Sequence, residues 1–554
     1  MSNRQHTVIA CVLALTCLYA LRLSSVEIQP WDEGLYAVRA QSIVLYNSWL
    51  DQSDHTIGGL YSSTPPPLVS WAVALSMQVF GPTPAAIRMF SVLCSGIALF
   101  VLYGIARRMM SFQSAILAMC VVAGSMHWAT YARQAMTEVP LMTFILLSIW
   151  SALRLVESTK NRSMWFFAVM AGVGFGAALL TKMTVSFFPL LVFGFLAMRS
   201  QRALLPFAVS VVVGLMIAAP WYGTMIAHHG AEFWQALLVP QVTTTVEGNA
   251  RSLGVLYYVN QLTVAHPVLL AAFAYVLLAV WKRRLLPSSS DNASIITMAW
   301  FVLGVIVFSL APTKNPHYVV MLIPASVLMA VYGIERLLEG GLRRVIVVVY
   351  AAVAAATMWS VLPGLRGSLR TLVLDPSMIP FIGIAVLFLV LPFVLPKRIV
   401  AELAVRAYRP VVYGACGVML LRTVMFIAID PPRMINGGRE IAGYLVDSPA
   451  HSFGYLYHQH NAGDVYNPQL AWYTAGWMTG WLPGKTVQPY AMSALHADEN
   501  ILAVASASST PFIVYYHPGQ SVDEKRLVAQ VLSSSYEIIS TSAEHYTLYA
   551  YKQR

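Results

Sequence analysis

The chain has 554 residues, of which 58% are hydrophobic and only 11% are charged, whereas about 25% are charged in an ordinary soluble domain. This composition excludes a single soluble globular domain and indicates a protein that crosses a membrane many times. The net charge of +11 is concentrated at the ends of apolar segments, where it acts as a topology signal. It therefore gives no reason to expect nucleic acid as a partner.

Apolar runs of about 17 to 22 residues, long enough to cross about 30 Å of hydrocarbon, recur up to about residue 429. The first run has no small-x-small cleavage site, so we interpret it as a retained helix and not as a secretory signal. The runs predict thirteen spans, at 7–23, 86–106, 111–129, 138–153, 164–181, 183–198, 203–222, 262–281, 293–311, 318–335, 343–361, 378–396 and 409–429.

Basic residues set the orientation, because Lys and Arg near helix ends stay on the cytoplasmic side. With the N-terminus in the cytoplasm, the cytoplasmic ends of the predicted spans carry about twice as many Lys and Arg residues as the outer ends. We therefore expect a transmembrane domain over residues 1–429. After Asp430 the long apolar runs stop, and residues 430–554 predict a separate extracytoplasmic α/β domain.

The first external segment, residues 24–85, carries the most informative motif of the chain. Asp32 and Glu33 are adjacent carboxylates just after the first apolar run, in a protein with few charges. Ionised groups at the rim of a membrane bundle are costly unless they bind a metal, a proton or a substrate. Further along, Ile43, Val44 and Leu45 indicate an amphipathic helix on the membrane surface.

Other ionisable and aromatic residues collect on the same predicted face. A second external loop supplies an arginine and a glutamate, a lysine interrupts two apolar runs, and a third segment reads Lys-Asn-Pro-His-Tyr. The residues are Arg133, Glu138, Lys182, Lys314, His317 and Tyr318.

Each of these residues also has a purely structural interpretation. Asp32, Glu33 and Glu138 could stabilise the first turn of a helix, because acids favour helix N-termini. Lys182 could extend its charged end to the interface, and Lys314 and His317 could be headgroup anchors. Together, however, acids and cations on one face suit a phosphate-bearing lipid. Cations stabilise a leaving phosphate, and a carboxylate accepts the proton of an attacking hydroxyl.

At these residues the chain resembles the GT-C membrane glycosyltransferases, in the branch with protein O-mannosyltransferases and bacterial aminoarabinose transferases that modify lipid A. The resemblance rests on Asp32-Glu33-x-x-Tyr36-Ala37, a later Pro-Pro-Leu segment, the Arg and Glu of the second loop, Leu-Thr-Lys at 180–182 and Lys-x-Pro-His-Tyr at 314–318. It covers roughly residues 20–340. The thirteen-span plan with an external C-terminal domain also fits the aminoarabinose transferases.

The resemblance implies an inverting glycosyltransferase in the bacterial cytoplasmic (inner) membrane. Its donor would be a sugar on a polyprenyl phosphate, and its acceptor a hydroxyl of a lipid, glycan or protein on the extracytoplasmic face. Asp32 would be the catalytic base, supported by Glu33, with Glu138 as the second acid. The residues expected to bind or orient the donor phosphate are Tyr36, Arg133, Lys182, Arg251, Lys314, His317 and Tyr318.

Two departures from the family pattern concern a metal ion. Thr64-Pro65 stands where aminoarabinose transferases have a Glu-Lys pair before Pro-Pro, and the external loop before Arg251 lacks the family's histidine. A divalent metal ion therefore stays a candidate cofactor without assigned ligands. Other acids available as ligands are Glu33, Glu232 and Glu247.

Two other classes of function remain open. A secondary transporter or lipid flippase also places charges in a polytopic bundle, but such proteins carry binding residues near the midplane and show inverted repeats. The ionisable residues here lie at the outer ends, with Arg422 as the main exception within a span, and no repeat is evident. A membrane assembly component with an external binding domain would use the acids only as helix caps.

Overall fold

The computed structural model of the chain describes most of residues 3–429 and parts of the C-terminal region. The described residues are 3–29, 32–56, 59–246, 254–265, 269–311, 314–361, 396–406, 409–429, 438–447, 452–458, 468–473, 486–492, 512–515, 536–542 and 546–551.

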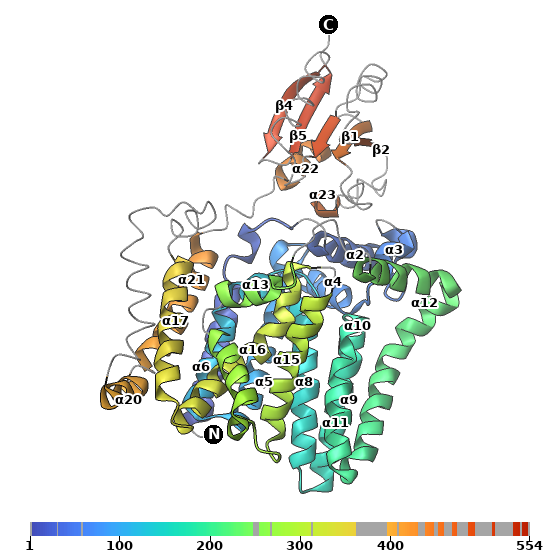
Figure 1. The fold of residues 1–554 in the computed structure, drawn as a ribbon. Helices are drawn as coiled ribbons and strands as arrows, with labels where there is room; N and C mark the ends of the chain where they lie inside the picture. The colour runs from blue at the N-terminus through green and yellow to red at the C-terminus, as the bar shows by residue number, and fades with distance from the viewer. Residues whose placement is uncertain are drawn as a thin grey trace, which may run out of the picture.

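Helices dominate the described part of the chain (Figure 1). Eight helical segments within it are long and apolar enough to cross a membrane, and α6 and α7, bent by 66°, together form a ninth candidate. The helices up to the second external loop are α1 (Asn3–Ala20), α2 (Asp32–Tyr46), α3 (Gly59–Ser63), α4 (Leu68–Phe80), α5 (Pro84–Met109), α6 (Phe112–Ala123) and α7 (Met126–Ala132). The helices that follow are α8 (Glu138–Glu157), α9 (Asn161–Leu179), α10 (Met183–Ser186), α11 (Phe188–Arg199), α12 (Leu204–Val246), α13 (Tyr257–Ala265), α14 (Leu270–Trp281), α15 (Asn292–Leu310), α16 (Val319–Glu339), α17 (Arg343–Val361), α20 (Lys397–Arg406), α21 (Gly414–Ile429), α22 (Gly438–Asp447) and α23 (Pro468–Tyr473).

The eight long segments coincide with eight of the thirteen predicted spans, and the predicted span 111–129 is the bent pair α6 and α7. The predicted spans 183–198 and 262–281 are shorter apolar helices, and 343–361 coincides with α17. Almost all of 378–396 lies outside the described residues. The structure thus shows a multi-pass helical membrane protein with eight or nine candidate spans among the described residues, and the count of thirteen stays a prediction.

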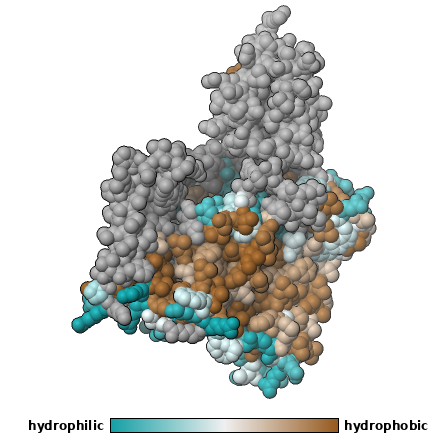
Figure 2. Space-filling model, in the orientation of Figure 1, coloured by the Kyte–Doolittle hydropathy of each residue, from teal (hydrophilic) through white to brown (hydrophobic). Residues whose placement is uncertain are grey.

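The surface of the bundle agrees with a membrane location. Figure 2 shows a band of hydrophobic residues between hydrophilic patches at the lower and upper edges of the visible face. Large apolar side chains such as Met216, Leu277 and Val307 are exposed, by 61 to 71%. A lipid environment accounts for such exposure, because contact of these apolar side chains with water is unfavourable and contact with lipid tails is not.

Helix α16 forms the centre of the bundle. Every residue from Val319 to Ile334 is buried, and the helix packs against α6, α8, α13, α14, α15 and α17. A helix that is apolar all round is stable only when other helices surround it. A short 3-10 turn, Pro316–Tyr318, leads directly into it, so the packing of α16 fixes the position of His317 and Tyr318.

The external segment folds into a compact unit on one side of the bundle, where Figure 1 shows α2 lying across the ends of the long helices. Its helix α2 contains the predicted amphipathic stretch, with Val38 and Ile43 buried and Leu45 exposed. The fully buried Arg39 donates to the Pro65 carbonyl at 2.8 Å and to Oε1 of Gln52 at 2.9 Å. This arginine therefore fixes the proline-rich segment that connects α3 to α4.

The first turn of α2 is anchored by a buried ion pair. Nε and Nη2 of Arg88, on α5, donate to the two carboxylate oxygens of Glu33, both at 2.7 Å. Glu33 also accepts the backbone N–H groups of Gln29 at 2.7 Å and Ala135 at 3.0 Å. The remaining donors of Arg88 go to the carbonyls of residues 23, 26 and 27. One ion pair thus joins α2, α5, the segment after α1 and the second external loop.

Five strands are described in the C-terminal region: β1 (Ser452–His458), β2 (Thr486–Met492), β3 (Phe512–Tyr515), β4 (Tyr536–Ser542) and β5 (Tyr546–Tyr551). They form one sheet in the order β2-β1-β3-β5-β4. β1 is parallel to β2 and β3, and β5 is antiparallel to β3 and β4. The hydroxyl of Tyr473 in α23 accepts the backbone N–H of Ile28 at 3.0 Å. The domain boundaries 1–429 and 430–554 stay a prediction.

We expect the close packing of α9 on α12 to depend on a glycine. A Cβ at Gly172 would lie 2.6 Å from the Ser210 carbonyl oxygen, whereas a Cβ at Gly223, also in a helix, would meet nothing within 4 Å. Gly172→Ala should lower the melting temperature in detergent by forcing the helices apart, at about 1–3 kcal/mol. Gly223→Ala should leave it unchanged or raise it, because alanine favours the helix. Equal effects of the two substitutions would contradict this packing.

We also expect the Glu33–Arg88 pair to be a major source of stability. Its side chains are 0 and 1% exposed, so Glu33→Gln leaves a buried guanidinium without its counterion, at about 3–5 kcal/mol. Glu157→Gln, which breaks the more exposed pair with Arg108, should cost less than about 1 kcal/mol. Thermal unfolding of the purified variants measures both. Similar melting temperatures for the two variants would argue against the anchoring role.

Candidate active site

The two adjacent acids at the start of α2 have different environments. Consecutive residues on a helix do not share a face, so Glu33 is buried against Arg88 while Asp32 is exposed. Asp32 is under the electrostatic influence of Glu138, Lys182 and His317. The structure therefore brings Asp32 together with three of the other predicted site residues, whereas the carboxylate of Glu33 is engaged elsewhere.

Desolvation by the surrounding protein raises the pKa of Asp32, even though solvent reaches the residue. The carboxylate of Glu138 adds to this rise, whereas His317 and Lys182 act in the opposite direction. A carboxyl group with a raised pKa holds a proton more tightly, which makes it a better general base than an ordinary aspartate.

Glu138 begins α8 and is buried. Its Oε1 accepts from Nζ of Lys182 at 3.4 Å and lies 3.9 Å from Nε2 of His317. Its Oε2 is buried and has no hydrogen-bond partner among the described residues. A buried carboxylate oxygen without a donor is costly, so this atom is a candidate acceptor for a hydroxyl or amino group of a ligand.

Lys182 lies between α9 and α10 with its side chain 27% exposed. Nζ is 5.2 Å from the ring centre of Tyr318, a cation–π contact. Burial alone would lower the pKa of Lys182, but Glu138, Tyr318, Tyr36 and Asp32 together raise it. The lysine is therefore charged at neutral pH and retains room for an anionic ligand.

Three aromatic side chains border these charges. The rings of Tyr131 and Tyr318 meet the imidazole of His317 edge-on, with centroids 6.3 and 4.7 Å apart. Desolvation and the nearby Asp32 raise the pKa of Tyr36 to about 12, so its hydroxyl keeps its proton. The site thus presents hydrogen-bond donors and ring edges beside the acids. Sequence reasoning did not select Tyr131, although it lies in the second external loop that carries Arg133.

Two predicted phosphate ligands, Arg133 and Lys314, donate hydrogen bonds to carbonyls at helix ends. Nη1 of Arg133 donates to the carbonyls of Tyr19 at 2.5 Å and Leu21 at 2.7 Å, at the C-terminus of α1. Nζ of Lys314 donates to three carbonyls at the C-terminus of α15, those of residues 308, 309 and 311. Basic side chains commonly satisfy the last carbonyls of helices in this way. Arg251 lies outside the described residues.

The position of the family's metal-binding glutamate does not fit a metal ion here. Thr64 stands at that position, and its buried hydroxyl donates to the Tyr61 carbonyl at 2.9 Å. Glu33 is engaged with Arg88, Glu232 is exposed, and Glu247 lies outside the described residues. None of the acids considered from the sequence is therefore placed by the structure in a metal-binding group.

A different group has the geometry to hold a metal ion, among the residues that the structure describes. One ligand atom from each of Asp51, His228 and His229 lies within 4.8 Å of the others. Sequence reasoning missed this group, because Asp51 is separated from the histidines by 177 and 178 residues. The adjacent histidines in an otherwise apolar run were the only signal.

Part of the chain matches a known family, and several proteins are similar to it over more than half of its length. Residues 64–224 match the family "Dolichyl-phosphate-mannose-protein mannosyltransferase". The undecaprenyl phosphate-alpha-4-amino-4-deoxy-L-arabinose arabinosyl transferase 2 of Pseudomonas fluorescens is 27% identical over 341 residues, 59% of this chain and 56% of that protein. The corresponding transferase of Pseudomonas aeruginosa strain PAO1 is 26% identical over 353 residues, 61% of each protein. The matches therefore span about three fifths of the length of these curated relatives.

Solved structures show the same fold over nearly the whole chain. The apo crystal structure of ArnT from Cupriavidus metallidurans superposes with a TM-score of 0.65 and 18% identity, over 98% of this chain and 97% of that one. The structure of that protein bound to undecaprenyl phosphate gives a TM-score of 0.64 and 16% identity, with the same coverage. The chain thus shares the fold of these ArnT structures over nearly its whole length.

Proposed function

We propose that the protein is an inverting glycosyltransferase that moves a sugar from a polyprenyl phosphate to a hydroxyl acceptor on the extracytoplasmic face of the bacterial inner membrane. The observation that carries the proposal is an exposed aspartate, Asp32, beside a buried glutamate, a charged lysine and a histidine. The names of the relatives support an undecaprenyl phosphate donor.

In the proposed reaction, Asp32 accepts the proton of the acceptor hydroxyl as the oxygen attacks the anomeric carbon of the sugar. The bond between that carbon and the phosphate oxygen breaks on the opposite face, which inverts the configuration. The electron pair leaves with the polyprenyl phosphate, whose charge Lys182 stabilises. Oε2 of Glu138 accepts a hydrogen bond from the sugar. Glu33, Arg133 and Lys314 act as positioning residues, because their charged groups are engaged within the protein.

The names of the relatives suggest 4-amino-4-deoxy-L-arabinose as the first sugar to test, and the resemblance to the aminoarabinose transferases suggests lipid A as the first acceptor. A lipid, a glycan and a protein hydroxyl all present the nucleophile that the mechanism requires. The predicted orientation, with the N-terminus in the cytoplasm and residues 430–554 outside, places Asp32 on the side where lipid-linked sugars are used. The thirteen-span plan and the external α/β domain belong to the same proposal.

The decisive experiment is transfer of labelled sugar from a panel of undecaprenyl phosphate sugars, including the aminoarabinose donor, to envelope acceptors in membranes. We expect Asp32→Asn to reduce turnover about 10²–10⁴-fold, the range for loss of a general base. Asp54→Asn is the matched control, because Asp54 is an exposed acid in the same external segment. If the Asp32→Asn protein transfers sugar as fast as the wild type at equal protein abundance, Asp32 is not the general base. Transport of a labelled lipid without sugar transfer would favour a flippase.

The pH dependence of the transfer rate provides an independent test. Asp32 acts as a carboxylate, so the rate should fall as the pH drops through its pKa, which lies above that of an ordinary aspartate because of desolvation. Lys182→Met removes a charge that lowers the pKa of Asp32, so the acid limb should move to higher pH. Glu138→Gln removes a charge that raises the same pKa, so the limb should move to lower pH. Lys160→Met, at an exposed position after α8, is the control. If the acid limb of the rate profile has the same midpoint in the wild type and in the three variants, Asp32 is not the base.

A further inference from the structure

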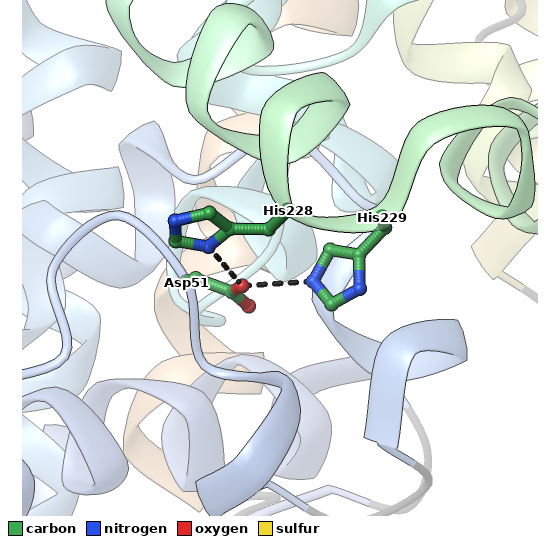
Figure 3. Close-up of side chains that lie close together, drawn as sticks. All are labelled: Asp51, His228 and His229. Atoms are coloured by element: carbon green, nitrogen blue, oxygen red, sulfur yellow. Dashed lines mark hydrogen bonds and ion pairs between the residues drawn. The ribbon is translucent and has the colours of Figure 1, made fainter.

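A carboxylate and two imidazoles from distant segments converge at one point of the external region (Figure 3). Oδ2 of Asp51 lies 3.0 Å from Nδ1 of His228 and 2.8 Å from Nε2 of His229. Figure 3 shows both rings pointing at the same carboxylate oxygen. The three side chains thus present one oxygen and two nitrogens to a common centre.

The backbone on both sides is arranged to permit this convergence. Consecutive residues on a straight helix point in different directions, but α12 breaks directly after the two histidines. Gly230 has φ 55° and ψ −127°, a conformation outside the helical region. Asp51 comes just before the 3-10 turn Ser53–His55. The bend in α12 and this turn therefore meet at the three side chains.

The second oxygen of Asp51 is held by its own loop. The backbone N–H and the hydroxyl of Ser53 donate to Oδ1 at 3.0 and 2.8 Å, which orients Oδ2 toward the histidines. The loop therefore fixes the direction of Oδ2, as outer-shell hydrogen bonds do for metal ligands.

We propose that Asp51, His228 and His229 bind a divalent metal ion, with Zn²⁺ as the preferred ion, and that this ion clamps the loop before α3 to the bend of α12. Two imidazoles and one carboxylate form a ligand set that zinc uses, with water in the fourth position. The side chain of His228 is 56% exposed and those of Asp51 and His229 are 16 and 20% exposed, so an ion and its water can enter. The proposal does not depend on the glycosyltransferase function.

The clamp would act on the segment next to the buried Arg39. Asp51 is followed by Gln52, whose Oε1 accepts from Arg39, and the same guanidinium holds the Pro65 carbonyl. An ion on Asp51 would thus fix one end of a hydrogen-bonded chain that leads to the proline-rich segment before α4.

The test uses the full-length protein, purified without a polyhistidine tag and stripped of metal with a chelator. Co²⁺ titration followed by visible absorption reports the ligand field, and elemental analysis after Zn²⁺ loading reports stoichiometry. We expect one equivalent of tightly bound metal in the wild type and in His6→Ala, which removes an exposed histidine of α1. Asp51→Asn and His229→Ala should each weaken binding at least about tenfold.

Thermal unfolding supplies a second readout that does not require activity. Zn²⁺ should raise the melting temperature of the wild type, because binding to the native state stabilises it, and should leave His228→Ala unchanged. The three side chains are instead a hydrogen-bonded cluster if the wild type binds no metal, or if Asp51→Asn and His229→Ala retain the wild-type affinity. Either result would overturn the proposal, and neither affects the test of Asp32.

Discussion

A buried charge must be matched by an opposite charge and by hydrogen bonds, and this requirement determines how α2 and the segments around it are assembled. Glu33 and Arg88 satisfy it for each other, with every remaining donor of Arg88 directed at a backbone carbonyl. Replacing one partner leaves the other charge uncompensated in a dry environment. Because the pair joins α2 to α5 and to the second external loop, the position of the neighbouring Asp32 depends on it.

The division of roles between the two adjacent acids follows from helix geometry. Glu33 points into the protein and is fully hydrogen-bonded, whereas Asp32 is left exposed beside Glu138, Lys182 and His317. A catalytic base must be both accessible and held in place. Two consecutive residues could meet these demands in the proposed reaction, with Glu33 anchoring the helix and Asp32 acting as the base.

The sequence predicted which charged residues gather at one end of the bundle, because charged residues in a mostly apolar chain lie at the ends of spans; the side of the membrane on which they lie stays a prediction. It placed Asp32, Glu138, Lys182 and His317 on one face, and the structure brings them together. The sequence did not reveal that Arg133 and Lys314 cap helix C-termini. A basic residue near a helix end gives the same sequence pattern whether its side chain binds a backbone carbonyl or a phosphate. The approach of Asp51 to His228 and His229 depends on a bend at Gly230. No local sequence pattern predicts a contact between residues so far apart in the chain. The helices at two predicted spans, α11 and α14, are shorter than the segments chosen from hydropathy, because hydropathy measures composition and not the length of the folded helix; that they cross the membrane stays a prediction.

The charge balance of the site bears on which donor it can accept. Two acids, Asp32 and Glu138, lie beside one lysine, Lys182, among the described residues of the site. A phosphate diester adds another negative charge, and the lysine of the family's Glu-Lys pair is Pro65 in this chain. More positive charge is therefore needed to hold the donor, since like charges at close range are strongly unfavourable where water is partly excluded. An ammonium group on the sugar would supply it next to the unpaired Oε2 of Glu138, and a neutral sugar would require a cation from another loop, such as Arg251. Whether the protein would accept an amino sugar or a neutral sugar therefore depends on which positive charge compensates Asp32 and Glu138.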